Sequence, residues 1–237
     1  MTVVVVGCGY IGCALAGQLA EAGHEVTGVR RSPDGLERVA AIDDSVEAIR
    51  ADATLPATLE SLPDADTVVF AASAGGRGAD VAREVYVEGL RNVLEEYGMR
   101  ADPPDRLVYT SSTGVYGNHD GGWVDETTPI DPTTAKTRVL ATAETVALSE
   151  ATSYGIDGTV ARFAGLYGPD RYRLERYIEG PVTAGYLNMV HRDDAAGAVR
   201  YLLEADVARG EPVVVVDDEP VDKHAFADWL AAECGVD

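Results

Sequence analysis

The sequence predicts an α/β fold in which helices cover both faces of a parallel sheet, the doubly wound arrangement, followed by a small C-terminal lobe. Two observations predict it. Strand-like runs of branched apolar residues alternate with helical patterns, which is typical of right-handed crossovers between parallel strands. The first run, Thr2 to Val6, contains four consecutive valines and suits a strand buried on both faces. We expect one domain over residues 1–165 and a reduced lobe over 166–237, whose last strand and helix pack back on the core.

A Gly-x-Gly-x-x-Gly loop, formed by Gly7, Gly9 and Gly12, follows the first strand directly. Gly7 permits the tight turn, Gly9 lets backbone amides approach a pyrophosphate, and Gly12 lets the next helix pack close to the strand. The motif alone is a weak signal, but a strand precedes it and a helical pattern follows it. The sequence therefore predicts a nucleotide-binding loop, and a purely structural tight turn is the alternative.

The helix after this loop carries Ile11, Leu15 and Leu19 at helical spacing and is expected to end near Gly23. Tyr10 and Ile11 lie at its amino-terminal end, where backbone amides and the helix dipole favour an anion. Both residues are therefore predicted to belong to the cofactor site.

The second strand, Glu25 to Val29, runs into Arg30, Arg31 and Ser32 instead of the acidic residue typical of NAD sites. A carboxylate there would repel a 2′-phosphate, whereas a guanidinium forms charge-assisted hydrogen bonds with it. These three residues thus favour NADP over NAD as cofactor. The alternative is that the two arginines are solvated loop charges.

The other elements follow in order along the chain. Strands are expected at 46–49, 67–71, 106–111, 158–162 and 213–216, and helices between Gly78 and Gly98, at 137–150, at about 194–204 and around 226–232. Ligands of such a sheet bind at the carboxyl ends of its strands.

Charge is the unusual feature of the composition. The chain has 40 acidic against 19 basic residues and a formal net charge of −21, and only Lys136 and Lys223 are lysines. This surface is a poor partner for nucleic acid or anionic membranes. Excess Asp and Glu with little Lys leads us to the hypothesis of adaptation to a salt-rich cytoplasm, where self-repulsion is screened.

The three cysteines, Cys8, Cys13 and Cys234, have no disulfide-framework or metal-ligand spacing, so we expect reduced thiols and no metal. No apolar stretch approaches membrane-spanning length, and the chain starts directly with a strand. These observations predict a soluble, cytoplasmic protein with no membrane partner.

Several motifs in order resemble one family. They are the glycine loop, Asp52, the Ala71-Ala72 strand end, Val108 to Gly117, Val124 to Pro129, Arg162 to Pro169 and Val190 to Asp194. Together they resemble the extended short-chain dehydrogenases/reductases, the NAD(P)-dependent epimerase/dehydratase family, over nearly the whole chain. The resemblance implies an NAD(P)-binding Rossmann fold.

The resemblance also assigns further cofactor residues. Asp52 and Ala53 would lie at the adenine, Ala71, Ala72 and Ser73 would line the middle of the cofactor, and Ser111 would lie near it. Without the resemblance, Asp52 would be a turn residue and the alanines a buried strand end.

Ser112 matches the family's catalytic serine, four residues before Tyr116. A hydroxyl there can hydrogen-bond a substrate carbonyl or alcohol oxygen during hydride transfer. The alternative is a strand-end serine that satisfies nearby backbone. Tyr116 and Thr113 are nearby candidates for catalysis and substrate binding.

One departure from the family matters more than the match. The family's proton donor is a Tyr with a Lys four positions later, and neither lysine of this chain has a tyrosine four positions before it. The matching segment offers Lys136 alone, or Thr134 and Arg138, which are poor proton donors. Tyr86 replaces the family's Asn and is either a relocated phenol or an aromatic on the inner face of its helix. The pattern resembles the atypical branch of the family.

For the substrate lobe, the resemblance and the local charge indicate Tyr167, Arg171, Arg176, Asn188 and His191. The arginines could meet an anionic substrate such as a sugar nucleotide, or form salt bridges instead. Asp193 or Asp194 is predicted to cap the next helix.

The sequence thus predicts an NADP-dependent oxidoreductase or epimerase for a small carbonyl or sugar-type substrate, with the proton supplied by Tyr116, Tyr86, Lys136 or water. The alternative is an NADP-binding redox sensor or assembly partner without turnover. The resemblance further implies a homodimer through the helices that start near Val81 and Thr137.

Overall fold

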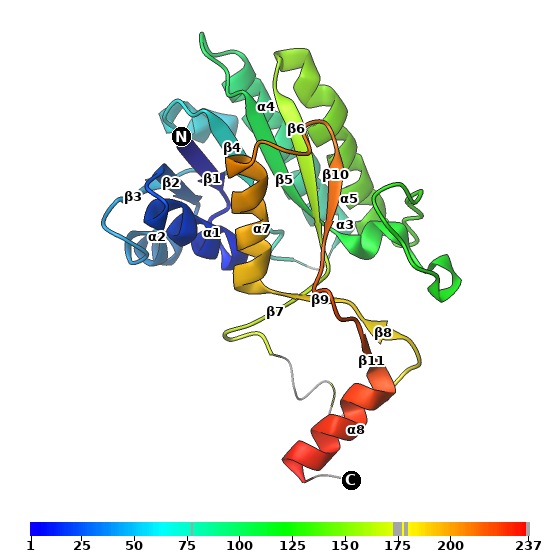
Figure 1. The fold of residues 1–237 in the computed structure, drawn as a ribbon. Helices are drawn as coiled ribbons and strands as arrows, with labels where there is room; N and C mark the ends of the chain where they lie inside the picture. Colours follow the sequence, from blue (N-terminus) through cyan, green and yellow to red (C-terminus); the bar gives the residue numbers. More distant parts are fainter. Residues whose placement is uncertain (77, 173–176, 178–179, 236–237) are drawn as a thin grey trace.

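The computed structural model describes residues 1–76, 78–172, 177 and 180–235. Its centre is a seven-stranded sheet in the order β10-β6-β5-β4-β1-β2-β3, in which all neighbouring strands are parallel (Figure 1). The strands are β1 (Thr2–Val6), β2 (Glu25–Arg30), β3 (Val46–Arg50), β4 (Thr67–Phe70), β5 (Arg106–Ser112), β6 (Asp157–Phe163) and β10 (Pro212–Val215). The predicted doubly wound α/β class is confirmed.

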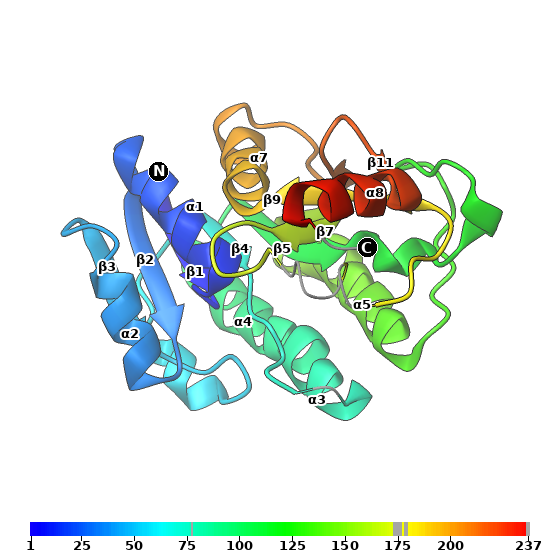
Figure 2. The same ribbon diagram turned by 90° about the horizontal axis from the view of Figure 1, so that it is seen from below.

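Helices cover both faces of this sheet (Figure 2). One face carries α1 (Tyr10–Glu21), α2 (Pro33–Ala40) and α7 (Arg192–Glu204), and the other carries α3 (Ala79–Arg83), α4 (Gly89–Gly98) and α5 (Ala135–Thr145). Short helical turns join them: η1 (Pro56–Ser61), η2 (Glu84–Glu88), η3 (Thr113–Tyr116), η4 (His119–Gly121), η5 (Val146–Glu150) and η6 (Ala151–Tyr154). The sequence analysis predicted neither α2 nor η1.

The four valines of β1 explain why a continuous apolar run is required here. Val3 and Val5 pack with α1 and α7 in one buried cluster, while Val4 and Val6 belong to the cluster on the opposite face. All four are at most 2% exposed. A strand in the middle of a covered sheet has no solvent side, so alternation of polar and apolar residues is lost.

The predicted long helix between Gly78 and Gly98 is helical throughout but contains a π turn, η2, between α3 and α4. The predicted helix 137–150 begins earlier, at Ala135, and also ends in a π turn, η5. Such turns are common near functional sites and leave no mark in the apolar periodicity.

The order of the strands reverses at β1, because the chain moves first to β2 and β3 and then returns to β4 on the other side. Ligands of doubly wound sheets bind outside the carboxyl ends of the strands at such a reversal, here the ends of β1 and β4. The glycine loop and the Ala71-Ala72 strand end therefore meet at this point.

After β6 the chain leaves the sheet and forms short strands: β7 (Gly165–Tyr167) pairs with β9 (Met189–His191), and β8 (Tyr186–Leu187) pairs with β11 (Val221–Asp222). Strand β10 returns to the sheet beside β6, as expected for the last long strand. The final helix α8 (Lys223–Cys234) differs from the expectation that it packs back on the core. It lies away from the sheet and buries only Leu230 (Figure 1). No helix in the described part of the chain is long and apolar enough to cross a membrane.

Candidate active site

The glycine loop closes against the neighbouring strand end so tightly that side chains are excluded. Gly7 has a φ of +85°, and a Cβ on it would lie 2.2 Å from the Cα of Ala72 and 2.3 Å from its backbone nitrogen. A Cβ on Gly12 would lie 3.0 Å from the carbonyl oxygen of Gly7 and 3.2 Å from Val5. The amides of Gly7 and Cys8 donate to the Val29 carbonyl at 3.2 and 3.0 Å and fix the turn to β2.

Helix α1 starts at this loop without a side-chain cap, since its N-cap residue is Gly9. Its first amides and the positive end of its dipole therefore suit an anion. Tyr10 turns toward the C-terminal lobe, where its hydroxyl donates to the Pro169 carbonyl at 3.1 Å. The guanidinium groups of Arg171 and Arg192 lie 5.2 and 5.5 Å from the centre of its ring. Positive charge thus gathers beside the glycine loop in a strongly acidic protein.

The end of β2 places Arg30 and Arg31 at the start of helix α2. A Cβ on Gly9 would lie 3.0 Å from Nη1 of Arg30, and the Nε atom of Arg30 is buried with no hydrogen-bond partner among the described residues. Arg31 has a 60% exposed side chain whose Nη1 lies 3.8 Å from the Asp52 carboxylate. Ser32 is the N-cap of α2 and accepts a hydrogen bond from the Gly35 amide at 3.3 Å.

These features fit a nicotinamide dinucleotide. The loop is a cradle that a Cβ would fill, the uncapped end of α1 suits a pyrophosphate, and the buried Nε of Arg30 has no partner in the described part of the chain. The residues that would hold its phosphates are the predicted Gly7, Gly9, Tyr10, Ile11 and Gly12, and this assignment stays a prediction.

The predicted adenine and middle positions lie just beyond the carboxyl ends of β3 and β4. Asp52 forms a turn in which its Oδ1 accepts from the amide and hydroxyl of Thr54 at 3.0 and 2.8 Å. Ala53 is buried and its carbonyl accepts from the Asn92 side chain at 2.8 Å. Ala71 and Ala72 are half-buried and Ser73 is exposed, beyond the end of β4. The assignment of these residues to the cofactor stays a prediction.

At the end of β5, the two neighbouring serines have different surroundings. Ser111 is buried and donates to the Glu144 carboxylate at 2.6 Å. Ser112 is half-buried, accepts from the Gly114 amide at 3.2 Å, and lines a cavity of about 300 Å³ that we call the serine cavity. Thr113 is half-buried beside it and begins η3. Glu144 therefore binds the hydroxyl of Ser111, and the hydroxyl of Ser112 is the one of the two that can meet a ligand in the serine cavity.

Tyr116 lies in a buried polar network rather than among the residues that line the serine cavity. Its hydroxyl accepts from Nη1 of Arg162 at 2.7 Å, and Nη2 of Arg162 lies 2.7 Å from Glu144. All three side chains are buried. Burial raises the pKa of Tyr116, and the Arg162 hydrogen bond only partly opposes this rise.

The other two candidate proton donors, Tyr86 and Lys136, are also not among the residues that line the serine cavity. Tyr86 lies in η2, is 9% exposed, and its hydroxyl accepts from the Ala74 amide at 3.2 Å. This contact places it on the inner face of its helix, where it holds the segment after β4. Lys136 is exposed in the first turn of α5. Thr134 caps that helix, and Arg138 donates to the carbonyls of Pro132 and Thr133 at 3.3 Å each.

In the C-terminal lobe, Tyr167 and His191 face each other on paired strands with ring centres 5.2 Å apart. Burial and the neighbouring Asp217 carboxylate raise the pKa of Tyr167. Asn188 is exposed between β8 and β9, and Arg171 lines the serine cavity. Arg176 lies outside the described residues.

The predicted cap of α7 is wrong. The N-cap is His191, whose Nδ1 accepts from the Asp193 amide at 3.3 Å. Asp193 and Asp194 lie in the first turn, where their charge complements the helix dipole.

Three residues that line the serine cavity from the C-terminal side were not predicted from the sequence. Tyr172, Tyr177 and Met189 line it together with Ser112 and Arg171. Their positions depend on how the stretch between β7 and β9 folds over the sheet, which no motif encodes. The only signal available was the high tyrosine content of that stretch.

The glycine loop also carries a thiol pair. The Cys8 thiol lies 3.8 Å from the Cys13 sulfur and donates a hydrogen bond to it, which lowers the pKa of Cys13 to about 7. The guanidinium of Arg30 contributes in the same direction, while burial of Cys13 opposes the shift.

Comparisons with known proteins agree with this geometry. The model of the NAD dependent epimerase/dehydratase family matches residues 3–216. Protein YeeZ of Escherichia coli (strain K12) is 34% identical over 209 residues, which cover 86% of this chain and 73% of YeeZ.

Two solved structures show the same likeness. A structure from Methylobacillus flagellatus, assigned to the NAD-dependent epimerases/dehydratases, has a TM-score of 0.81 at 31% identity and covers 100% of this chain and 82% of that one. DesIV of Streptomyces venezuelae, a dTDP-glucose 4,6-dehydratase solved with NAD and DAU bound, has a TM-score of 0.84 at 22% identity with the same coverage. The chain thus belongs to the NAD dependent epimerase/dehydratase family and has the NAD(P)-binding Rossmann fold of the extended short-chain dehydrogenases/reductases.

Proposed function

We propose that this protein is an NADP-preferring oxidoreductase or epimerase-like enzyme that acts on a small carbonyl or sugar-type substrate. The observation that carries the proposal is Ser112, a half-buried serine that lines the serine cavity at the carboxyl end of β5. In the proposal, residues 1–165 hold the cofactor and residues 166–237 hold the substrate. The substrate-binding residues are Thr113, Tyr167, Arg171, Arg176, Asn188 and His191.

The preference for NADP rests on the end of β2. Arg30 and Arg31 stand where an NAD site usually carries a carboxylate, and the N-terminus of α2 begins next to them. Two carboxylates lie in the same region, Asp34 in the first turn of α2 and Asp52 3.8 Å from Arg31, and the two guanidinium groups would offset their repulsion of a 2′-phosphate. Two guanidinium groups and a helix N-terminus together favour a 2′-phosphate over a bare hydroxyl.

The chemistry assigned to the chain itself is polarisation and proton supply. A bound nicotinamide dinucleotide supplies or accepts the hydride. Ser112 would donate a hydrogen bond to the reacting oxygen as negative charge develops on it, which stabilises the transition state. The Gly114 amide donates a hydrogen bond to the Ser112 hydroxyl at 3.2 Å and so orients it.

The proton that completes carbonyl reduction needs a source that reaches the same cavity. Tyr116, Tyr86 and Lys136 remain candidates. However, the Tyr116 hydroxyl accepts from Arg162, the Tyr86 hydroxyl accepts from the Ala74 amide, and Lys136 is exposed on α5. Tyr172 and Tyr177 line the serine cavity, so a phenol from the C-terminal side, or water, fits the role better.

A second candidate function is an NADP-binding sensor or assembly partner without turnover. The absence of any Tyr-x-x-x-Lys pair favours it, as does the engagement of the Tyr116 hydroxyl by Arg162. We further propose a cytoplasmic location. We also propose a homodimer through α3 and α5, because these two helices pack side by side and Val81 of α3 leaves an apolar side chain 41% exposed for a partner.

The deciding experiment is NADPH oxidation with a panel of carbonyl compounds in molar KCl. An enzyme should oxidise NADPH with at least one compound, and Ser112→Ala should reduce the rate about a hundredfold, as for loss of one oxyanion donor. Ser61→Ala, an exposed serine in η1, serves as control. Tight NADPH binding without any turnover would leave the sensor function instead.

A further inference from the structure

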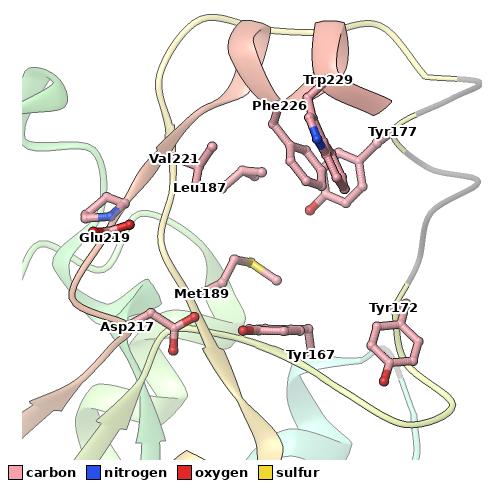
Figure 3. A pocket seen from close by; sticks show the side chains of 11 residues that line it. Tyr167, Tyr172, Tyr177, Leu187, Met189, Asp217, Glu219, Val221, Phe226 and Trp229 are labelled. Atoms are coloured by element: carbon pink, nitrogen blue, oxygen red, sulfur yellow. The ribbon is translucent and has the colours of Figure 1, made fainter. Parts of the chain in front are cut away.

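We infer that the substrate carries an uncharged, flat apolar ring system that binds in an aromatic pocket next to Ser112, and that nucleoside diphosphate sugars are excluded from this pocket. The inference rests on the proposed function, because it takes Ser112 as the reacting end of the site. The aromatic pocket has a volume of about 370 Å³ and lies between β7 and β9 on one side and α8 on the other (Figure 3).

Aromatic rings form the wall on the α8 side (Figure 3). The ring of Tyr177 meets Phe226 edge-on, with centres 5.2 Å apart and an angle of 88° between the planes. Phe226 in turn stacks with Trp229 at 6.0 Å and 23°. A flat apolar ring would add to this arrangement by stacking or edge contact, whereas a sugar ring with its hydroxyls would leave donors unpaired.

The opposite wall continues the apolar surface. Met189 of β9, Tyr167 of β7 and Tyr172 lie across the pocket from Phe226, and Leu187 of β8 lies beside Val221 (Figure 3). Met side chains adapt to ligand shape and make favourable contacts with aromatic rings. The pocket volume is within the range of small-molecule sites lined mainly by apolar side chains.

Charge excludes the nucleotide alternative. Asp217 and Glu219 are the only charged side chains among the described residues that line the pocket, and both are carboxylates. A diphosphate placed here would lose its water, find no cation among these residues, and meet two like charges. An uncharged ring pays none of these costs.

The aromatic pocket and the serine cavity adjoin each other. Tyr172, Tyr177 and Met189 line both of them. A single ligand can therefore place its carbonyl or alcohol oxygen near Ser112 while its ring lies against Phe226. The position of the ring then selects the substrate, and Ser112 acts on its polar end.

The chain offers a built-in reporter for this pocket. It has two tryptophans, Trp123 and Trp229, and only Trp229 lines the pocket. Trp123 is 83% exposed, so Trp123→Phe should not disturb the fold. Fluorescence of this variant in molar KCl is titrated with the neutral bicyclic ketone 2-tetralone, with UDP-glucose, and with phenyltrimethylammonium.

We expect 2-tetralone to change the Trp229 emission in a saturable manner and UDP-glucose to leave it unchanged. Adding Phe226→Ala should raise the Kd for 2-tetralone about tenfold, which is the usual size of the effect when an aromatic contact is lost from a binding site. Tyr201→Ala removes an aromatic side chain that is 64% exposed on α7 and does not line the pocket, so it should leave the Kd unchanged. Circular dichroism checks that each variant is folded.

Three results would overturn the inference: a saturable response to UDP-glucose, a response to phenyltrimethylammonium but not to 2-tetralone, or a 2-tetralone Kd that ignores Phe226→Ala. The second result would identify a cation site made of aromatic rings and carboxylates. NADPH binding to the same variant, measured by calorimetry, separates this inference from the proposed function. If NADPH binds and is oxidised with a carbonyl compound while Trp229 responds to UDP-glucose, only the inference fails. If 2-tetralone binds as expected but NADPH does not bind, the proposed function fails.

Discussion

Replacing Gly7 by alanine tests whether the glycine loop is shaped by its contact with the end of β4. Gly7 has a φ of +85°, and its missing Cβ would lie 2.2 Å from the Cα of Ala72, far inside the ordinary contact distance of 3.4–4 Å. Gly23 provides a matched control, because its φ is +83° and no atom lies within 4 Å of its missing Cβ. The two substitutions share the backbone strain and differ in the clash.

The expected free energies follow from this difference. An L-residue in left-handed backbone costs roughly 1–2 kcal/mol, which Gly23→Ala should show alone. Gly7→Ala should add about 1–3 kcal/mol for overpacking against backbone that cannot rotate away. Its total loss of about 2–5 kcal/mol is a large share of the roughly 5–15 kcal/mol that stabilises a typical domain.

Urea unfolding in molar KCl, followed by circular dichroism, measures both losses, and NADPH titration measures the effect on the site. We expect Gly7→Ala to unfold at lower urea than Gly23→Ala and to bind NADPH more weakly, because Ala72 must move. Equal losses of unfolding free energy in the two variants would refute the contact as the reason for this glycine.

Further predictions concern the thiol pair, the buried ion pair and salt. Since the thiolate is the reactive form and the pKa of Cys13 is lowered to about 7, iodoacetamide labelling of a Cys234→Ser variant should rise with pH to half its maximum near pH 7, and a midpoint near the ordinary 9.0 would contradict this. Glu144→Gln should cost about 3–5 kcal/mol in urea unfolding, because it leaves the Arg162 cation buried without its partner, and a loss below about 1 kcal/mol would show that the network is dispensable. The melting temperature should rise from dilute buffer to molar KCl, as screening relieves the net charge of −21, and an unchanged value would remove the salt-adaptation hypothesis.

The strands and the glycine loop could be predicted because one physical constraint applies along each whole element. In β1 this constraint is burial on both faces, and in the loop it is the close approach of backbone atoms. Four valines in a row admit only a buried strand at this length, and the loop that follows needs a glycine at each close approach. Helix α2 could not be predicted from apolar periodicity, since it buries only Gly35 and Val39. Its one available signal was Ser32 followed by proline, a cap with a proline in the first turn.

The candidate site could be predicted on the cofactor side and not on the substrate side. Ser112 belongs to an ordered motif on a regular strand, so its place at the carboxyl edge of the sheet followed from the strand order. Phe226 and Trp229 lie three residues apart on α8 and therefore share one face of that helix, but Tyr177 joins them only through the path of the lobe after β6. His191 replaced the expected aspartates as cap of α7 because its ring nitrogen reaches the Asp193 amide, a local choice that composition does not reveal.

The measurement that tests the central claim most directly is a calorimetric titration with NADPH and NADH in molar KCl, on the unaltered protein and on Arg30→Asp. Arg38→Asp makes the same charge change near the end of α2 and serves as control. We predict that NADPH binds more tightly than NADH, that Arg30→Asp weakens NADPH binding about tenfold to a hundredfold while NADH binding holds or improves, and that Arg38→Asp changes little. Binding of neither nucleotide, or equal affinity for both in the unaltered protein, would contradict the proposal of an NADP-preferring enzyme.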